Sequence, residues 1–348
     1  MIARATDDQN GAAPAAWPHG MALRKRNAAP PTEFRQRHAA RSLVPADQSA
    51  PRLRAIAVFM LITHILCPTD FSEAAANALE HAVAIAGCYK ARLTVLHVGM
   101  AAATESDVAR LHRETAAAAE LTEAAGGVLD VVVADGDPAQ TIVSEAQQQP
   151  ADLLVMGTHG LGGFQRFILG SVTEKVLRKA ATPVLTVPPL AGGTAHLPFQ
   201  KMLCGIDFSP CSLSALQYAR SLARESRAAL IVVHSLEWPW EEPPAPAFDE
   251  LPPAEATALQ TYRRTRELQA TERLVTLAST GAGAECRVAC RVVHGKAYAA
   301  VLRVAEEEHA DLIVLGVGGR TGTDRAVFGS TTNQVVRQAT CPVLTIRR

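Results

Sequence analysis

The chain has 348 residues, of which 48% are hydrophobic, and its 34 Lys and Arg residues equal its 34 Asp and Glu residues in number. This length suits about two globular domains. After residue 60 the chain carries 25 Lys and Arg against 30 Asp and Glu, which argues against the basic face that nucleic-acid binding requires. The seven cysteines contain no CxxC pair, which favours reduced thiols over a disulfide framework or a zinc site. No run reaches the roughly 18 to 20 apolar residues that a membrane-spanning helix needs.

Residues 1–60 differ in composition from the rest of the chain. They are rich in Ala, Arg and Pro, and they carry nine Lys or Arg residues against four Asp or Glu residues. Because they lack sustained apolar periodicity, we expect a disordered basic extension. A targeting or interaction arm is the functional alternative. A cleaved signal peptide is not expected, since the first long apolar run begins too far from Met1.

From residue 61 onward, short apolar runs alternate with stretches of helical periodicity. Strands are expected over residues 61–67, 92–98, 129–135, 152–157 and 183–187. Helices are expected over residues 72–89, about 104–125, 139–149 and 171–180. Strands that are apolar on both faces and separated by helices are typical of a parallel sheet with right-handed crossovers. The fold class expected is therefore α/β, a doubly wound parallel-sheet sandwich of about five strands.

The same pattern then returns, so the chain is expected to hold two such sandwiches in tandem. Residues 151–187 align without gaps on 310–346, with 18 identities in 37 positions. Upstream, "PTDFS" matches "GIDFS", which aligns Asp70 with Asp207. These aspartates are 137 residues apart, whereas the two aligned segments are 159 apart, so the second copy should contain an insertion of 22 residues. The Pro-rich acidic segment at about 237–258 is expected to supply it as an exposed loop.

These spacings suggest a first domain over residues 61–188, a linker over 189–199 and a second domain over 200–348. Both domains repeat one glycine spacing, G-x2-G-x9-G-S, directly after the fourth strand. Its members are Gly157, Gly160, Gly170 and Ser171 in the first copy and Gly316, Gly319, Gly329 and Ser330 in the second.

Glycines after a strand permit positive φ and let backbone N–H groups approach a ligand closely. The helix that follows adds unpaired N–H groups and a partial positive charge, which suit phosphate. The competing interpretation is structural, because Ser171 and Glu174 form the S-x-x-E pattern of a helix capping box. Neither a P-loop nor a complete G-x-G-x-x-G motif occurs.

Together these motifs resemble the universal stress protein family in its tandem, two-domain form. The resemblance covers about residues 61–348 and rests on the duplicated glycine spacing, the aspartate after the first strand and the closing Pro-Val-Leu-Thr strand. It implies an adenine nucleotide alpha hydrolase-like sandwich in each domain and ATP as ligand, and it leaves a role for Mg²⁺ open. It also implies association through the closing strands, either between the two domains as a pseudo-dimer or between two chains.

The resemblance assigns residues to two nucleotide sites. The first comprises Asp70 and Val98 near base and ribose, Met156, Gly157, Thr158 and Gly160 along ribose and phosphates, and Gly170, Ser171 and Val172 around the phosphates. The second comprises Asp207, Ser235, Leu315, Gly316, Val317, Gly319, Gly329, Ser330 and Thr331. Val317 lacks the hydroxyl of Thr158, so the second site departs further from the pattern. Asp70 and Asp207 remain open to two other interpretations, as helix caps or, for Asp70, as a ligand of Mg²⁺.

Other duplicated residues fit structural roles as well as chemical ones. His97 and His234 are expected to be hydrogen-bonded near the sheet edge rather than catalytic, since no nucleophile motif accompanies them. Arg166 and Arg325 suit either a phosphate contact or a salt bridge that fixes the loop.

We therefore expect a cytoplasmic, ATP-binding module with a regulatory or protective role under stress, without catalytic residues, bound metal cluster, nucleic acid or membrane partner. The alternatives are a slow ATPase or phosphotransferase and an association module that binds no nucleotide.

Overall fold

A computed structural model describes the greater part of both repeats. It covers residues 62–99, 105–159, 169–189, 191–192, 194, 197–237, 252–279, 287–318 and 328–347. The expected basic extension at 1–60 lies outside these ranges. So do Gly160, Gly319 and the two loop arginines, Arg166 and Arg325.

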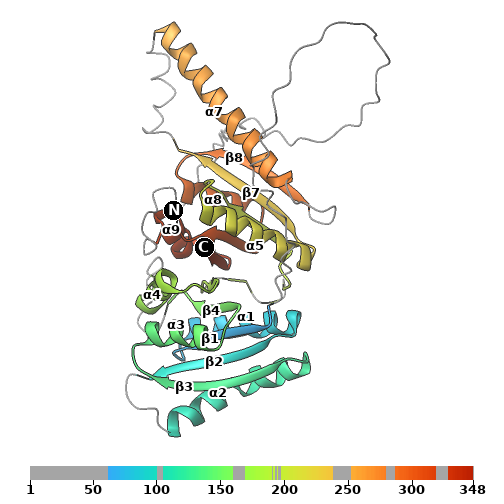
Figure 1. The fold of residues 1–348 in the computed structure, drawn as a ribbon, viewed down its shortest axis with the longest axis vertical. Helices are drawn as coiled ribbons and strands as arrows, with labels where there is room; N and C mark the ends of the chain where they lie inside the picture. Colours follow the sequence, from blue (N-terminus) through green and yellow to red (C-terminus); the bar gives the residue numbers. More distant parts are fainter. Residues whose placement is uncertain are drawn as a thin grey trace, which may run out of the picture. The chain divides into compact units, whose positions relative to one another are not determined.

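Each repeat alternates strands with helices in the predicted order (Figure 1). The first repeat contains β1 (His64–Thr69), α1 (Glu73–Tyr89), β2 (Arg92–Gly99), α2 (Glu105–Ala124), β3 (Val128–Asp135), α3 (Pro138–Gln148), β4 (Leu153–Gly157), α4 (Ser171–Lys179) and β5 (Val184–Val187). The second contains β6 (Lys201–Gly205), α5 (Pro210–Ser226), β7 (Ala229–Leu236), α7 (Pro253–Ser279), β8 (Val288–His294), α8 (Ala297–Glu307), β9 (Leu312–Gly316), α9 (Ser330–Gln338) and β10 (Val343–Ile346).

The strands form one sheet in the order β3-β2-β1-β4-β5-β10-β9-β6-β7-β8. Within each repeat all neighbouring strands are parallel. In the first repeat the chain runs outward from β1 to β2 and β3, then returns to β4 on the other side of β1. This reversal of strand order is the place where doubly wound sheets bind ligands, beyond the carboxyl ends of the strands. The predicted fold class is confirmed.

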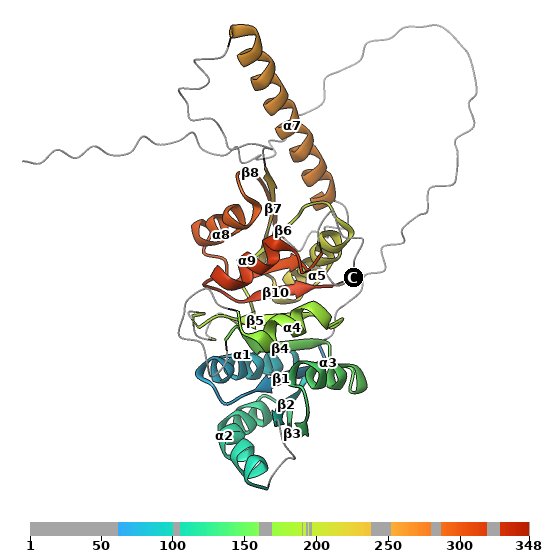
Figure 2. The same ribbon diagram turned by 90° about the vertical axis from the view of Figure 1, so that its left-hand side faces the viewer.

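Helices cover both faces of the sheet (Figure 2), and the core divides into two clusters accordingly. Adjacent residues of β1 alternate between them: Ile65 and Cys67 belong to one cluster and Leu66 to the other. Ala78 of α1 packs in the first cluster and Val176 of α4 in the second. This alternation follows from the two-residue period of a strand that is buried on both sides.

The two closing strands pair with each other, and this pair alone is antiparallel among the described strands. Leu185 of β5 lies opposite Leu344 of β10. Two buried threonines add cross-strand hydrogen bonds, from Thr186 Oγ1 to the carbonyl of Val343 at 3.2 Å and from Thr345 Oγ1 to the carbonyl of Val184 at 3.1 Å. Neither closing strand is therefore an open edge.

Most boundaries differ from the predicted ones by one or two residues, and two differ by more. The first strand begins at His64 rather than at residue 61. The insertion predicted as a loop over 237–258 is helical from Pro253, where the 27-residue helix α7 begins, whereas residues 238–251 lie outside the description. Proline suits the first turn of a helix, because its missing N–H has no acceptor there in any case. Among the described helices, none has the length and apolar composition needed to cross a bilayer.

Candidate functional site

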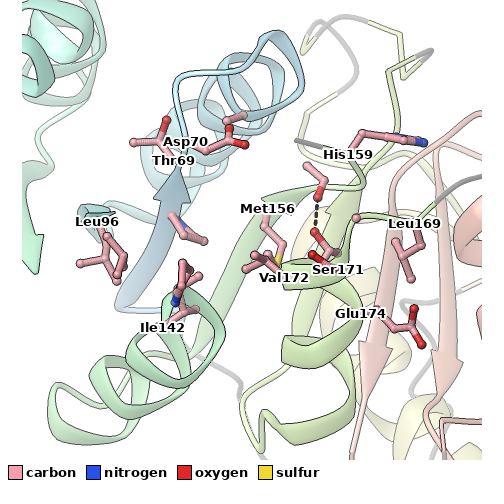
Figure 3. Close-up of a pocket in the computed structure, with 17 residues that line it drawn as sticks. Thr69, Asp70, Leu96, Ile142, Met156, His159, Leu169, Ser171, Val172 and Glu174 are labelled. Atoms are coloured by element: carbon pink, nitrogen blue, oxygen red, sulfur yellow. Dashed lines mark hydrogen bonds between the residues drawn. The ribbon is translucent and has the colours of Figure 1, made fainter. Parts of the chain in front are cut away.

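A cavity of about 580 Å³ opens in the first repeat where β1, β2 and β4 end (Figure 3). It therefore lies at the reversal of strand order between β1 and β4. Its apolar wall consists of Leu96, Val98, Ile142, Met156 and Leu169. Its polar side includes Asp70, His159, Ser171, Thr173 and Glu174. A mostly apolar cavity of this size with a few convergent polar groups is typical of a small-molecule site.

Seven of the nine residues assigned to the first site line this cavity: Asp70, Val98, Met156, Gly157, Gly170, Ser171 and Val172. Thr158 is not among the lining residues. Its side chain is buried, and its hydroxyl lies 2.8 Å from Nδ1 of His159. Gly160 belongs to the part of the chain that the structure does not describe.

Asp70 sits in a tight turn between β1 and α1. One of its carboxylate oxygens accepts the backbone N–H of Ser72 at 3.0 Å, and Phe71 between them has a φ of 63°. The helix cap is Ser72, whose hydroxyl accepts the N–H of Ala75 at 3.2 Å. The interpretation of Asp70 as the cap of this helix is therefore wrong, and the turn instead directs its carboxylate to the cavity.

The second repeat contains the same turn. The N–H of Ser209 donates to the carboxylate of Asp207 at 2.9 Å, Phe208 has a φ of 64°, and Ser209 caps α5. The interpretation of Asp207 as a helix cap is wrong for the same reason.

A stack of three side chains supports each turn. In the first repeat, Phe71 lies against the ring of His97 with centroids 4.4 Å apart, and the guanidinium of Arg110 lies 4.0 Å from the Phe71 ring. Nδ1 of His97 is 2.9 Å from the carbonyl of Thr69, so the histidine is tied to the end of β1. A cation over an aromatic face is attractive, and the stack therefore stabilises a backbone conformation that is unfavourable for Phe71.

His234, Phe208 and Arg273 repeat this stack in the second domain, with centroids at 4.6 Å and the guanidinium at 4.1 Å. His234 is buried and its Nδ1 lies 2.7 Å from the carbonyl of Ile206. Both histidines are thus hydrogen-bonded, as predicted.

The motif glycines serve close approach rather than positive φ. Gly170 has φ −59° and ψ 141°, and Gly329 has φ −57° and ψ 138°, which any residue can adopt. The prediction of positive φ is wrong at these two positions. At Gly157, in contrast, a Cβ would lie 2.7 Å from the carbonyl oxygen of Ala74. At Gly316 it would lie equally close to the backbone of Cys211.

The start of α4 leaves backbone donors toward the cavity. Gly170 is the N-cap residue and makes no side-chain capping bond, so the predicted capping box of Ser171 and Glu174 is wrong. The N–H groups of the first helical residues, 171–173, have no acceptor within the helix. Thr173 Oγ1 donates to the carbonyl of Gly157 at 2.9 Å, which fixes this helix end to the end of β4. In the second repeat Thr332 bonds Gly316 in the same way at 2.8 Å.

An ion pair joins the two helices beside the cavity. Asp137 caps α3, and Lys175 Nζ of α4 lies 3.6 Å from its carboxylate. The N–H of Gln140 lowers the pKa of the Asp137 carboxyl, and Lys175 lowers it further. The ionised carboxylate of Asp137 therefore stabilises the folded protein, in which the start of α3 lies beside α4.

The second set of assigned residues is packed differently. Leu315 and Val317 are buried, as Met156 and Thr158 are in the first repeat, but the hydroxyl of Ser235 donates to the carbonyl of Gly295 at 2.7 Å, which its counterpart Val98 cannot do. A Cβ on Gly205 would lie 2.6 Å from a methyl carbon of Leu315, so the leucine occupies space beside this glycine. Asp207, Gly316, Gly329, Ser330 and Thr331 hold the same sequence positions as their first-repeat counterparts, and Gly319 lies outside the described residues.

The universal stress protein family model matches this chain twice, over residues 62–188 and 198–347. The chain belongs to the universal stress protein family. "Universal stress protein MJ0531" of Methanocaldococcus jannaschii is 34% identical over an alignment of 140 residues, which covers 36% of this chain and 82% of that protein.

Solved structures of other universal stress proteins resemble the fold. A crystal structure from Archaeoglobus fulgidus matches with a TM-score of 0.57 at 23% identity, over 82% of this chain and 98% of that chain. At this identity the likeness shows the fold alone. A universal stress protein crystallised in complex with cAMP is 28% identical, over 37% of this chain and 98% of that chain, with a TM-score of 0.31.

Sequence reasoning on this universal stress protein missed about half of the cavity lining. The lining residues that were not assigned are Pro68, Thr69, Ala75, Leu96, Pro138, Ile142, His159, Leu169, Thr173 and Glu174. Several of them directly flank an assigned residue, and that proximity was the available signal. Pro138 and Ile142 carry no motif, and they reach the cavity because α3 starts at the edge of the sheet where β1 and β4 also end. No group of three or more His, Cys, Asp or Glu residues suited to a metal occurs within the described ranges.

Proposed function

We propose that this universal stress protein binds an adenine nucleotide, ATP, in the cavity of its first repeat. The observation that carries the proposal is the combination of an apolar wall with the uncapped N-terminus of α4 in one cavity of about 580 Å³. The wall suits a base, and the helix end suits phosphate. The protein would act in the cytoplasm as a regulatory or protective module under stress.

The residues around the cavity suggest how the ligand would lie. The base would pack between Leu96, Val98 and Ile142, and the carboxylate of Asp70 would accept a ribose hydroxyl. The phosphates would receive the N–H groups of residues 171–173 and the hydroxyl of Ser171. Gly160 and Thr158 complete the proposed set for the first site.

Mg²⁺ fits this site as a partner of ATP. The described lining residues include the carboxylates of Asp70 and Glu174 but no Lys or Arg, and carboxylate oxygens are ligands that Mg²⁺ accepts. When bound, the ion would offset the negative charge of the phosphates. In that arrangement Asp70 would hold the ion from the protein side instead of contacting the ribose.

The second repeat offers a weaker site, which we propose to comprise Asp207, Ser235, Leu315, Gly316, Val317, Gly319, Gly329, Ser330 and Thr331. Leu315 beside Gly205 and the hydrogen bond of Ser235 to Gly295 both reduce its likeness to the first. We accordingly expect the first site to bind ATP more tightly.

We also propose two domains, 61–188 and 200–348, joined by a linker over 189–199 and arranged as a pseudo-dimer. The antiparallel pairing of β5 with β10 supports this arrangement. A homodimer through the same strands would require that pairing to open.

Mass spectrometry of the small molecules released from the purified full-length protein tests the proposal. We expect adenine nucleotide, mainly ATP, at up to one or two equivalents per chain. Recovery of ADP and AMP after incubation with ATP and Mg²⁺ would favour the slow ATPase instead. Absence of any nucleotide, together with no binding of added ATP, would contradict the proposal and favour an association module.

A further inference from the structure

Glu174 places a second carboxylate at the edge of the cavity, next to the helix end that we propose for phosphate. It belongs to the first turns of α4, and it lines the cavity (Figure 3). An uncompensated carboxylate here would repel a polyphosphate and oppose the favourable charge of the helix N-terminus. The state of this carboxylate therefore affects which ligands the cavity accepts.

Two guanidinium groups flank this carboxylate, one at each oxygen. Arg178, one turn further along α4, lies 2.8 Å from Oε1. Arg337 lies 3.7 Å from Oε2 and comes from α9 of the second repeat. The charge of Glu174 is thus balanced in part by the other domain.

The pairing of the closing strands explains why Arg337 can reach the first repeat. Helix α4 precedes β5 and α9 precedes β10, and both helices contribute to one core cluster through Val176 and Val335. The guanidinium of Arg337 is oriented by its own helix, since its Nε donates to Asn333 Oδ1 at 2.8 Å. Arg347, after β10, also donates to the carbonyl of Leu177 in the last turn of α4 at 3.0 Å.

This connection runs in one direction only. The gap-free alignment of the repeats places Asn333 at the position of Glu174 and Arg337 at the position of Arg178. Extended by one residue, the same alignment places Pro188 at the position of Arg347. The second repeat therefore supplies arginines to α4 of the first. The reverse connection lacks both partners, because the second repeat has no carboxylate at Asn333 and the first repeat has no arginine at Pro188.

We propose that Arg337 is a positioning residue of the first nucleotide site, which acts from the second domain by neutralising and orienting Glu174. This inference rests on the proposed function. Its consequence is selectivity by charge: loss of Arg337 leaves Glu174 less compensated and disfavours a ligand in proportion to its phosphate charge. Because the pair is partly exposed, the expected loss of ATP affinity is about three- to tenfold, with no loss for uncharged adenosine.

Calorimetric titration of the full-length protein with ATP and with adenosine, without Mg²⁺, tests this inference. Arg337→Gln should weaken the affinity for ATP and leave the affinity for adenosine unchanged. In a Glu174→Gln background the same change should have no further effect, since the carboxylate on which it acts is gone. Arg303→Gln is the matched control, because it removes the same charge from a second-repeat arginine that pairs with Glu307 instead.

The outcomes are distinguishable. Unchanged ATP affinity in Arg337→Gln, an equal loss for adenosine, or an equal loss in the Glu174→Gln background would each overturn the inference and leave the proposed function standing. If the wild-type protein bound neither ATP nor adenosine, both the inference on Arg337 and the proposed function would be contradicted. Arg337→Lys, which keeps the charge, should restore most of the ATP affinity; failure to do so in a folded protein would also count against charge compensation.

Discussion

The glycines of the repeated motif have different structural roles, although their shared spacing suggests a single role. Gly157 and Gly316 permit the start of a helix to lie against a strand end, because a Cβ there would meet backbone at 2.7 Å. Gly170 and Gly329 adopt backbone angles open to any residue and precede a helix N-terminus, and a Cβ on Gly329 would lie 3.2 Å from the carbonyl oxygen of Val317, a longer approach than at Gly157 or Gly316. The two pairs should therefore respond differently to substitution.

Gly157→Ala should destabilise the fold. The added methyl group must displace the backbone around Ala74, and overpacking of this kind typically costs about 1–3 kcal/mol. Urea denaturation followed by circular dichroism measures the loss. Gly192→Ala is the control, since its Cβ would meet no atom within 4 Å. Equal stability of both variants would show that the close approach of Ala74 relaxes without cost.

At the level of elements, the sequence alone was sufficient for the order of strands and helices. Apolar runs broken by helical periodicity gave nearly every boundary of the first repeat within three residues, and the duplication supported each assignment. The insertion was harder, because α7 begins inside a Pro-rich segment that resembles a loop.

The candidate site was predictable only where a motif marked it. Asp70, Gly157 and Gly170 lie in duplicated patterns, whereas Ile142 reaches the cavity through topology and leaves no local signal. The capping interpretation of Ser171 failed because the helix starts at Ser171, one residue earlier than a capping box with Ser171 as the N-cap would require. Local pattern does not fix such a one-residue offset.

The ion pair between α3 and α4 predicts a pH dependence. The pKa of Asp137 is lowered in the folded protein from 3.8, first by the N–H of Gln140 and then by Lys175. A lowered pKa contributes stability above the unfolded value, and this contribution is lost as the pH falls through the folded value. Asp137→Asn keeps a capping oxygen but removes the charge.

The unfolding free energy of Asp137→Asn should therefore lie below that of wild type near neutral pH, and the difference should shrink as the pH falls below 3.8, the ordinary value of the carboxyl. Denaturation at a series of pH values measures the difference. A gap that stays constant across this range would mean that the carboxylate charge contributes nothing.

For the whole molecule, the antiparallel pair of β5 and β10 is the central connection between the repeats. If the second repeat were removed, β5 would become an open edge with an apolar sequence, and such edges associate. A fragment of residues 62–197 should therefore form dimers in solution at micromolar concentration. Light scattering after size-exclusion chromatography measures its mass. A folded fragment that stays monomeric would contradict the view that the closing strand requires a partner.

The central claim is that the first-repeat cavity binds ATP through the start of α4. Calorimetric titration of the full-length protein with ATP, compared between wild type and Gly170→Val, tests it most directly. Val tolerates the observed φ of −59° and ψ of 141°, so circular dichroism and thermal unfolding should stay near wild type while the tighter ATP-binding event disappears. Gly329→Val is the matched variant and should leave that event intact. Wild-type ATP binding by a well-folded Gly170→Val protein would contradict the account.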